Sequence, residues 1–423
     1  MRVMKDSGIE WIGQIPNDRI LIRNKYSLSY VKGKIPSETN TEQNGVPYIG
    51  ASDLDILSGN SGYSLYTSDI DIPMCDSEDI LVLWDGARAG LIGRNHTGAI
   101  SSTIVRITPS DFINKRFFFW YLKGFEKYLY ECVNGTTIPH MKKRYIEDIF
   151  MLDWSINDQQ SIADFLDDKC GKIDHYIEKQ RLIIEKLKEY KQSVITEAVT
   201  KGLNPDVPMK DSGLENNLLI PAHWENRKVI SILSMRVVDG AHESPELFDE
   251  GIPYISATAI ENGKIDFSKM RGFISEEYCD ICDQRYIPQL NDILMIKLGA
   301  STGQVAMVET TDRFNIWVPL AAIRCNQNAN PKFVYYAFQS DYFVKQMELS
   351  WTYGTQQTLG VKTIERLRIL LPPIDEQNRI AEYLKCKCEV IENIIEKKQL
   401  IVSKFNEYKK SLIYEAVTGK LEV

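Results

Sequence analysis

The sequence predicts an α+β protein in which two mixed α/β domains alternate with two long helices that pack antiparallel as a coiled coil. Three observations carry this prediction. The chain has 423 residues, which exceeds the roughly 250–300 residues at which a single hydrophobic core stops growing. It contains an internal repeat, and each copy of the repeat carries an apolar heptad pattern. Because duplicated units tend to associate symmetrically, the repeat also predicts a pseudo-twofold arrangement.

The repeat is clearest in two segments that begin at Ile162 and Ile380 and align without a gap as far as Thr200 and Thr418. About half of the aligned positions are identical. Weaker matches precede each copy, among them a Lys-Asp-Ser-Gly tetrapeptide near the start of each half. The chain is therefore predicted to be a tandem duplication with four parts: a domain at residues 1–155, a helix at 156–203, a second domain at 204–373 and a second helix at 374–423.

Each repeated segment has the pattern of a long coiled-coil helix, with an apolar seam, a charged outside and no proline. Asp375 gives a start signal for the second helix, and Gly202 and Gly419 give stop signals for the two helices. One polar residue, Gln180 or Lys398, interrupts each seam at the same place and can fix its register. The predicted seam residues, all apolar, are Leu166, Ile173, Ile183, Leu187, Val194, Leu384, Ile391, Ile401, Phe405 and Leu412.

The two domains are predicted to mix strands and helices. Short apolar runs suited to strands, such as residues 80–84 and 293–296, lie between clusters of Gly, Asn, Asp and Ser. Aromatic-rich runs with helical character follow at residues 117–130 and 333–347. The same order in both halves favours a duplicated α+β domain.

The composition is that of a folded protein. Hydrophobic residues make up 43% of the chain and charged residues 26%, which is ordinary for a globular protein. No apolar run reaches the roughly 18 residues of a membrane-spanning helix, and the N-terminal residues lack the apolar region of a secretory signal. We therefore expect a cytoplasmic protein with no membrane contact, whose eight cysteines are reduced.

Catalytic motifs are mostly missing. No GxxxxGK[ST] phosphate loop is present, and Leu371-Pro-Pro is not the Asn-Pro-Pro-aromatic motif of an amino-methyltransferase. Gly86-x-x-x-Gly90-x-x-Gly93 resembles a cofactor-binding loop, but the second copy has Ala306 at its third position, which favours a strand-to-strand turn. Cys279-x-x-Cys282 has zinc-like spacing, although a structural zinc site needs four ligands, so no metal is expected.

The charge distribution restricts where DNA could bind. The net charge is −8, and residues 204–373 hold 21 acidic against 16 basic side chains, so contact would depend on a few placed groups. Basic and amide side chains recur at matching places in both halves, beside the glycine run and after a Gly-Thr loop, which favours DNA binding over solvated surface. These DNA-binding candidates are Arg88, Arg94, Asn95, His96, Thr136, Thr137, His140, Lys142, Lys143, Arg144, Lys297, Ser301, Thr302, Gln304, Thr355, Gln356, Gln357, Thr358 and Lys362.

Several motifs in combination resemble those of type I restriction–modification specificity subunits, and the resemblance spans essentially the whole chain. They are Lys5-Asp-Ser-Gly-Ile-Glu-Trp-Ile-Gly-Gln-Ile-Pro16, Asp211-Ser-Gly-Leu with Ile220-Pro-Ala-His-Trp224, Leu371-Pro-Pro-Ile-Asp-Glu-Gln377, Arg379-Ile-Ala-Glu-Tyr-Leu384 and the Glu-Ala-Val-Thr sequences at Glu197 and Glu415. The first half departs from the pattern, because Arg19 stands where the second copy has Trp224, and Trp154 where it has Pro372.

The resemblance implies a non-catalytic subunit with two target-recognition domains, each of which reads one half of a split double-stranded DNA site. The two helices would act as a spacer and bind two adenine-specific methyltransferase subunits that use S-adenosylmethionine. Two restriction subunits that use ATP and Mg would join for cleavage. The alternatives are a solitary or fused DNA-modifying enzyme whose motifs are not recognised, and a coiled-coil adaptor without a role on DNA.

Overall fold

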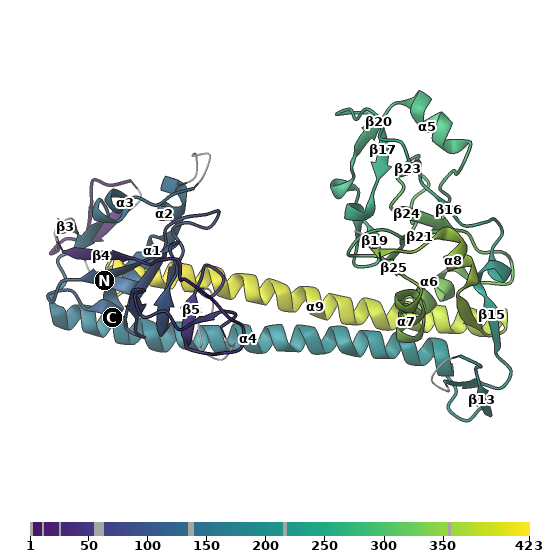
Figure 1. Cartoon of the computed structure of the whole chain (residues 1–423), viewed down its shortest axis with the longest axis horizontal. Helices are drawn as coiled ribbons and strands as arrows, with labels where there is room; N and C mark the ends of the chain where they lie inside the picture. Colours follow the sequence, from purple (N-terminus) through teal and green to yellow (C-terminus); the bar gives the residue numbers. More distant parts are fainter. Residues whose placement is uncertain are drawn as a thin grey trace. The chain divides into compact units, whose positions relative to one another are not determined.

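The computed structural model describes residues 3–10, 12–24, 27–54, 63–133, 139–214, 218–353 and 357–423. The chain forms two compact units, the first built from Met1–Arg181 with Gln399–Val423 and the second from Leu182–Lys398. Each unit combines one strand-rich domain with parts of two long helices, α4 (Ile156–Lys201) and α9 (Ile374–Val417) (Figure 1). The predicted α+β class, with two mixed domains and two long helices, is confirmed.

The first unit is built around two four-stranded sheets, in the orders β6-β5-β10-β7 and β4-β11-β8-β9. Its strands are β1 (Met4–Asp6), β2 (Gln14–Pro16), β3 (Leu21–Arg23), β4 (Leu28–Lys32), β5 (Val46–Ile49), β6 (Tyr66–Thr67), β7 (Met74–Cys75), β8 (Ile80–Leu83), β9 (Ile92–Gly93), β10 (Gly98–Ile100), β11 (Ile104–Pro109) and β12 (Phe150–Leu152). Its short helices are α1 (Lys115–Gly124), α2 (Glu126–Val133) and α3 (Lys143–Glu147). The aromatic run predicted to be helical at residues 117–130 forms α1 and α2, and its buried Phe117 and Tyr121 share one core with β8 and β11.

The second unit repeats this plan, because its sheet β16-β24-β21-β22 matches β4-β11-β8-β9 strand for strand. Its strands are β13 (Met209–Asp211), β14 (Leu219–Pro221), β15 (Glu225–Lys228), β16 (Val238–Asp239), β17 (Ile252–Ile255), β18 (Ile260–Glu261), β19 (Lys264–Ile265), β20 (Gly272–Ile274), β21 (Ile293–Ile296), β22 (Val305–Met307), β23 (Asn315–Ile316), β24 (Leu320–Ile323), β25 (Thr352–Tyr353), β26 (Gln357–Thr358) and β27 (Arg368–Leu371). Its short helices are η1 (Val229–Ile232), η2 (Ala257–Ala259), η3 (Phe267–Lys269), α5 (Glu276–Asp283), α6 (Pro331–Gln339), α7 (Asp341–Leu349) and α8 (Val361–Arg366).

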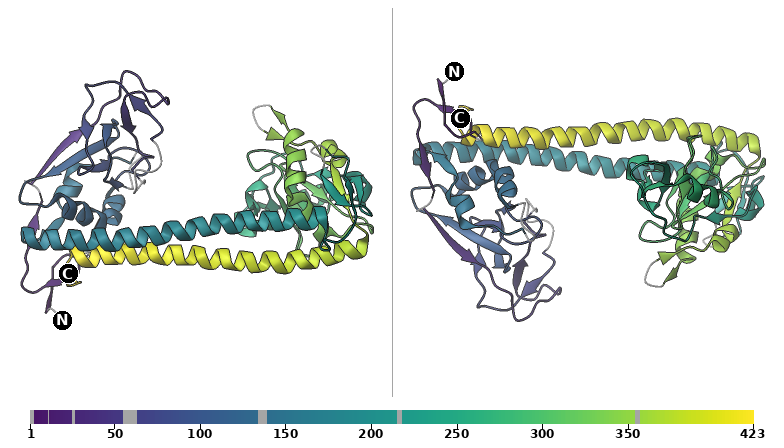
Figure 2. Two further views of the ribbon diagram at one scale, coloured as in Figure 1. Left: turned by 90° about the horizontal axis from the view of Figure 1, so that it is seen from below. Right: turned by 90° about the horizontal axis from the view of Figure 1, so that it is seen from above.

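Helices α4 and α9 pack antiparallel within each unit (Figure 2). In the first unit, Ile173 near the start of α4 shares a cluster with Leu412 near the end of α9. In the second unit the ends are reversed, because Ile195 of α4 shares a cluster with Leu384 of α9. Ion pairs follow the same rule, as between Lys409 and Asp174 at 2.6 Å in the first unit. The predicted antiparallel arrangement is therefore confirmed.

The predicted seam consists of two rows of residues, one of which contains Leu166 and Ile173 and the other Ile183. The structure agrees with the first row only. Five of its members are buried (Leu166, Ile173, Leu384, Ile391 and Leu412) and three are half-buried (Leu187, Val194 and Phe405). Ile183 and Ile401 were placed wrongly, since each side chain is 38% exposed. The second row of buried residues lies four positions after the first, as at Cys170, Ile177 and Ile184, rather than three. A seam of alternating four- and three-residue steps still has the coiled-coil period, but with a different phase.

A buried glutamine in the first turn of each long helix holds the neighbouring domain. The Oε1 atom of Gln159 accepts the backbone N–H of Asn114 at 2.8 Å, and Oε1 of Gln377 accepts the N–H of Asn330 at the same distance. Both asparagines are N-caps, of α1 and α6 respectively. In each unit, the start of a long helix is therefore bound to the start of a short helix of the adjoining domain, α4 to α1 in the first unit and α9 to α6 in the second.

The two halves fill one equivalent position with tryptophans from different places in the sequence. Gly419, which follows α9, would bring a Cβ within 3.1 Å of the Trp154 ring, and Gly202, which follows α4, would bring one within 3.3 Å of Trp224. Both glycines have positive φ angles, of 71° and 76°, where a glycine ends a helix without strain. The packing of the first unit is thus preserved although Arg19 replaces the tryptophan of the second copy.

Candidate nucleic-acid interface

In the first unit, two of the predicted polar clusters meet at the end of strand β8. The N–H of Gly86 in the β8–β9 turn donates to the carbonyl of Pro139 at 3.1 Å, and the N–H of Met141 donates to the carbonyl of Trp84 at 2.8 Å. The glycine turn and the segment that enters α3 are far apart in sequence. Their backbone hydrogen bonds place Arg88 and the cations of α3 on neighbouring segments. We refer to this pairing of the glycine turn with the segment before α3 as the junction.

The second unit contains the same junction. The N–H of Gly299 in the β21–β22 turn donates to the carbonyl of Gln357 at 3.0 Å, and the N–H of Leu359 donates to that of Lys297 at 2.8 Å. Gly86 and Gly299 have φ angles of 108° and 98°, which only glycine adopts readily. Since both glycine runs connect antiparallel strands, the interpretation as strand-to-strand turns is confirmed over that of a cofactor loop.

The junction of the first unit carries a carboxylate held by two basic groups. Asp85 lies 2.9 Å from Nζ of Lys32 and also contacts the imidazole of His140. Burial alone would raise the pKa of Asp85, but Lys32 and His140 together hold it below its ordinary value. Lys143 follows His140 on the segment that enters α3, and its ammonium lies 5.0 Å from the ring centre of Tyr30.

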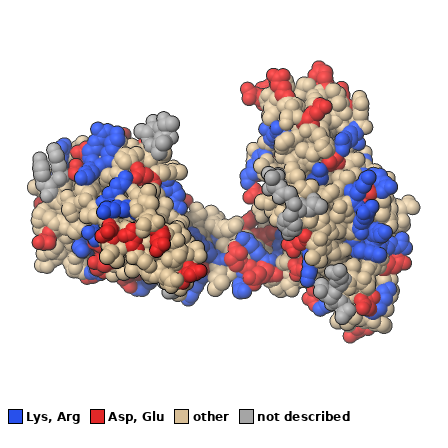
Figure 3. Space-filling view, in the orientation of Figure 1, with Lys and Arg blue, Asp and Glu red and all other residues tan. Residues whose placement is uncertain are grey.

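Three exposed cations follow this junction at the start of α3, namely Lys142, Lys143 and Arg144. Figure 3 shows Lys and Arg side chains gathered over α3. Their nitrogen atoms are accessible to a polyanion.

The junction of the second unit reverses the charges of the first. Strand β16 supplies the carboxylate of Asp239, which lies 3.0 Å from Nζ of Lys297, 3.1 Å from His242 and in contact with Arg285. Burial opposes ionisation of Asp239, yet the three basic neighbours keep its pKa below the ordinary value. In the first unit the equivalent strand β4 instead supplies the cation, Lys32. One backbone frame therefore presents two different electrostatic patterns.

The structure corrects two candidates in the first unit. Arg94 is directed to the long helix, where its guanidinium lies 2.9 Å from Asp167 and packs on the Phe119 ring at 4.6 Å. His96 is 2% exposed, and burial lowers the pKa of its imidazole. Both side chains are occupied in packing, so we no longer assign them to DNA.

Two candidates in the second unit are corrected for the same reason. Lys297 is 9% exposed, and its ammonium is taken up by Asp239. The hydroxyl of Thr302 is also buried and donates to the carbonyl of Gly299 at 2.7 Å. A side chain that already satisfies a buried partner cannot turn to a base without leaving that partner unpaired.

The remaining described candidates lie at the surface of their units. Gln357 and Thr358 are half-buried, and the exposed members are Arg88, Asn95, His140, Lys142, Lys143, Arg144, Ser301, Gln304 and Lys362. Thr136, Thr137, Thr355 and Gln356 lie outside the described residues. In each unit, the fold thus brings the described candidates of the glycine turn next to those of the segment that leads into α3 or α8.

The sequence interpretation missed the acidic centre of each junction. Asp85 directly precedes the glycine turn, which is a local signal that could have identified it. Asp239 and His242 are three residues apart, but Lys297 and Arg285 are distant in sequence and reach Asp239 only through the fold, so no short motif contains the whole group.

Two structural findings concern metals and membranes. Within the described ranges, no three His, Cys, Asp or Glu side chains are placed to hold one metal ion. Cys279 and Cys282 lie buried on α5, and burial raises the pKa of the Cys279 thiol to about 11. No helix in the described part of the chain is both long and apolar enough to cross a membrane.

Comparison with known proteins yields a consistent set of similarities. A model of the type I restriction modification DNA specificity domain matches residues 28–192 and 222–402. The type I restriction enzyme MjaVIII specificity subunit of Methanocaldococcus jannaschii is 25% identical over 418 residues, which are 97% of this chain and 94% of the relative. The EcoBI specificity subunit of Escherichia coli is 26% identical over 403 residues, or 91% and 82% of the two chains. A chain from a solved structure of the type I R-M system has the same fold, with a TM-score of 0.66 at 14% identity over 96% of this chain and 99% of that one.

Proposed function

The chain belongs to the type I restriction modification DNA specificity family, and from this premise we propose that each of its two domains reads one half of a bipartite DNA site. The chain is a DNA specificity subunit, a non-catalytic component of a type I restriction–modification system, with two target recognition domains. The observation that carries the proposal is the junction shared by both domains, which has one backbone frame and different side chains.

The side chains at the two junctions differ in what they can recognise. In the first unit Arg88 and His140 are exposed beside the glycine turn, whereas in the second Ser301 and Gln304 occupy that turn. An arginine pairs best with guanine, and a glutamine pairs best with adenine. Two domains that differ in this way would select different half-sites, as an asymmetric DNA target requires.

Exchange of one domain tests this proposal. Replacement of residues 1–155 by the equivalent domain of another family member should change one half of the methylated motif and leave the other half intact. Methylome sequencing of a host that expresses the chimera with its partner subunits gives the result. A change in both halves of the motif, or in neither, would contradict independent reading.

Two point variants distinguish a residue that contacts DNA from a residue that stabilises the packing of its unit. Arg144→Gln should leave thermal stability unchanged and make the plot of log binding constant against log salt shallower by about 0.9, as expected for one lost phosphate contact. Arg94→Gln should instead destabilise the first unit by about 1–2 kcal/mol, because Asp167 loses a charged partner, while the salt dependence stays the same. The measurements are thermal unfolding and DNA titrations of the assembled complex. Equal salt slopes for the wild type and Arg144→Gln would contradict the contact.

We also propose that the long helices bind two methyltransferase subunits in equivalent ways. Among the exposed apolar side chains of α4 and α9, three in each unit follow the seven-residue spacing of one heptad row, and the two sets are repeat equivalents of one another. They are Tyr176, Ile401 and Tyr408 in the first unit and Ile394, Ile183 and Tyr190 in the second, with exposures of 38–57%. Apolar stripes of this kind favour a partner helix, and two matching stripes favour two copies of one partner.

The remaining roles of the complex would belong to the other subunits. On the basis of the family, S-adenosylmethionine would bind to the methyltransferase subunits, and ATP with Mg would bind to two restriction subunits. We infer further that α4 and α9 set the gap between the half-sites, because each is a single helix that takes part in both units.

A further inference from the structure

A basic groove lies between η1 and α8 in the second unit. Its volume is about 560 Å³, and the charged residues that line it are Lys228, Arg236, Lys362, Glu365 and Arg366. Figure 3 shows Lys and Arg side chains gathered over α8 and β15, near the right edge of the view. The concentration is notable because residues 204–373 as a whole have an acidic excess.

The carboxylate of Glu365, which lines the groove, already has partners. Glu365 is 7% exposed, and it accepts hydrogen bonds from Arg236 Nη1 at 2.7 Å and from the backbone N–H of Val237 at 3.1 Å. Arg236 is therefore held in place by a buried partner. Glu365 neutralises one of the four cations, so the groove retains a net positive charge.

The other three cations are not paired with an acid among the described residues. Lys228, Lys362 and Arg366 are exposed, and none of them forms an ion pair with any residue in the described part of the chain. Three unpaired cations around a concave surface repel one another, and a bound anion would relieve that repulsion.

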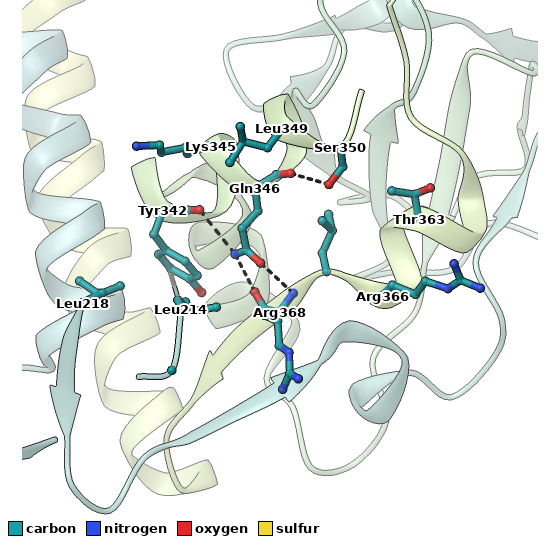
Figure 4. Close-up of a pocket in the computed structure, with 12 residues that line it drawn as sticks. Leu214, Leu218, Tyr342, Lys345, Gln346, Leu349, Ser350, Thr363, Arg366 and Arg368 are labelled. Carbon is teal, nitrogen blue, oxygen red and sulfur yellow. Dashed lines mark hydrogen bonds between the residues drawn. The ribbon is translucent and has the colours of Figure 1, made fainter. Parts of the chain in front are cut away.

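The pocket on the other side of α8 has a different character. It measures about 620 Å³ and includes Leu214, Leu218 and Tyr342 in its lining. Arg366 belongs to the lining of both pockets, and Figure 4 shows its guanidinium pointing outward, away from Gln346 and Tyr342. Gln346 spans it with hydrogen bonds to the backbone of Arg368, at 3.0 and 3.1 Å. Its lining also includes Lys345 and Arg368, so the two pockets share a basic character. The apolar side chains of this pocket set it apart from the groove.

The groove lies at the position in the second unit that is equivalent to the start of α3 in the first unit, where Lys142, Lys143 and Arg144 are exposed. Helices α3 and α8 are repeat equivalents, and each follows the segment that hydrogen-bonds to the glycine turn. Lys362 is the equivalent of Arg144, and Glu365 is the equivalent of Glu147. The same element thus carries exposed cations in both units, although the other groove cations come from β15 and the loop after η1.

We propose that this groove binds phosphates of the DNA backbone beside the second half-site, with Lys228, Lys362 and Arg366 as the contacting residues and Arg236 as a fixed fourth cation. The proposal rests on the proposed function, because it concerns how the second domain holds its DNA. Flexible lysines suit phosphate oxygens better than the shaped edge of a base. The groove would therefore supply affinity without selecting sequence.

The test uses the assembled complex that contains the triple variant Lys228→Gln, Lys362→Gln, Arg366→Gln. Binding to DNA with the methylated motif and to unrelated DNA should weaken by the same factor. Each lost contact should flatten the salt slope by about 0.9 and reduce affinity about fivefold near 0.15 M salt. The matched control is Lys264→Gln, an exposed lysine of the same domain outside the groove, which should change neither quantity. The methylated motif should stay the same in the triple variant.

The outcomes separate the groove from the function as a whole. If the wild-type complex binds its motif and the triple variant has the same affinity and salt slope as the control, the groove proposal is wrong and the function stands. If the triple variant changes the methylated motif, the residues read bases and the phosphate assignment is wrong. Loss of co-purification with the partner subunits, with DNA binding otherwise intact, would assign the groove to an acidic protein surface and overturn the proposal. If the wild-type complex itself shows no motif-dependent binding, the proposed function fails.

Discussion

An aspartate in place of Ile391 is expected to lower the free energy of unfolding by about 3–5 kcal/mol, because the change buries a charge in the seam between α4 and α9 and removes apolar contact. The Ile391 side chain is only 5% exposed. Thermal unfolding of the full chain, followed by far-ultraviolet circular dichroism, should show the long helices melting at a lower temperature.

The matched control lies one helical turn away. Ile394 is the same residue type on the same helix, but it is 38% exposed. Ile394→Asp should leave the melting temperature nearly unchanged and should weaken capture of the methyltransferase subunit in co-purification. Equal melting temperatures for the two variants would show that the seam does not have the phase described above.

Replacement of Gln377 by leucine is expected to cost about 3–5 kcal/mol, since it leaves several buried polar groups without partners. The Oε1 atom accepts the N–H of Asn330 at 2.8 Å, and Nε2 donates to the carbonyls of Pro372 and Asn328 at 2.9 and 3.1 Å. Leucine matches the size of glutamine, so the loss would come from the hydrogen bonds. Amide exchange should also increase at the start of α6, where Asn330 is the N-cap.

Asn378 provides the control for this change. It accepts a hydrogen bond from the side chain of the same Asn330 at 2.7 Å, but it is exposed. Asn378→Ala should cost at most about 1 kcal/mol, because water replaces the lost contact. If Gln377→Leu and Asn378→Ala were equally stable, burial would not be what makes the glutamine contact important.

The helices could be predicted from the sequence, but the phase of their seam could not. Apolar residues occupy three rows of each helix, and a two-helix seam buries only two of them. Ile183 and Ile184 are adjacent and chemically identical, yet one is exposed and the other buried. Hydrophobicity alone cannot distinguish the row that faces the other helix from a row available to a partner.

The candidate interface was predictable where repetition marked it. The glycine turns and the segments before α3 and α8 recur in both halves, and the fold brings them together. Burial of individual side chains was less predictable, because Arg94 and Lys297 are ordinary surface residue types whose partners, Asp167 and Asp239, are distant in sequence. Only the folded chain reveals that these cations are already neutralised.

The paired tryptophans limit where related genes can recombine to exchange a recognition domain. Trp154 packs against Gly419 and carries Arg19 over its ring at 4.5 Å, whereas the second half places its indole at the position equivalent to Arg19. A crossover between positions 19 and 154 can therefore join a tryptophan at the first position to a tryptophan at the second, which gives two indoles for one site. The reverse combination leaves the site with no indole. Crossovers that transfer both positions as one cassette keep the volume beside Gly419 constant, so such junctions should be enriched among functional hybrid subunits.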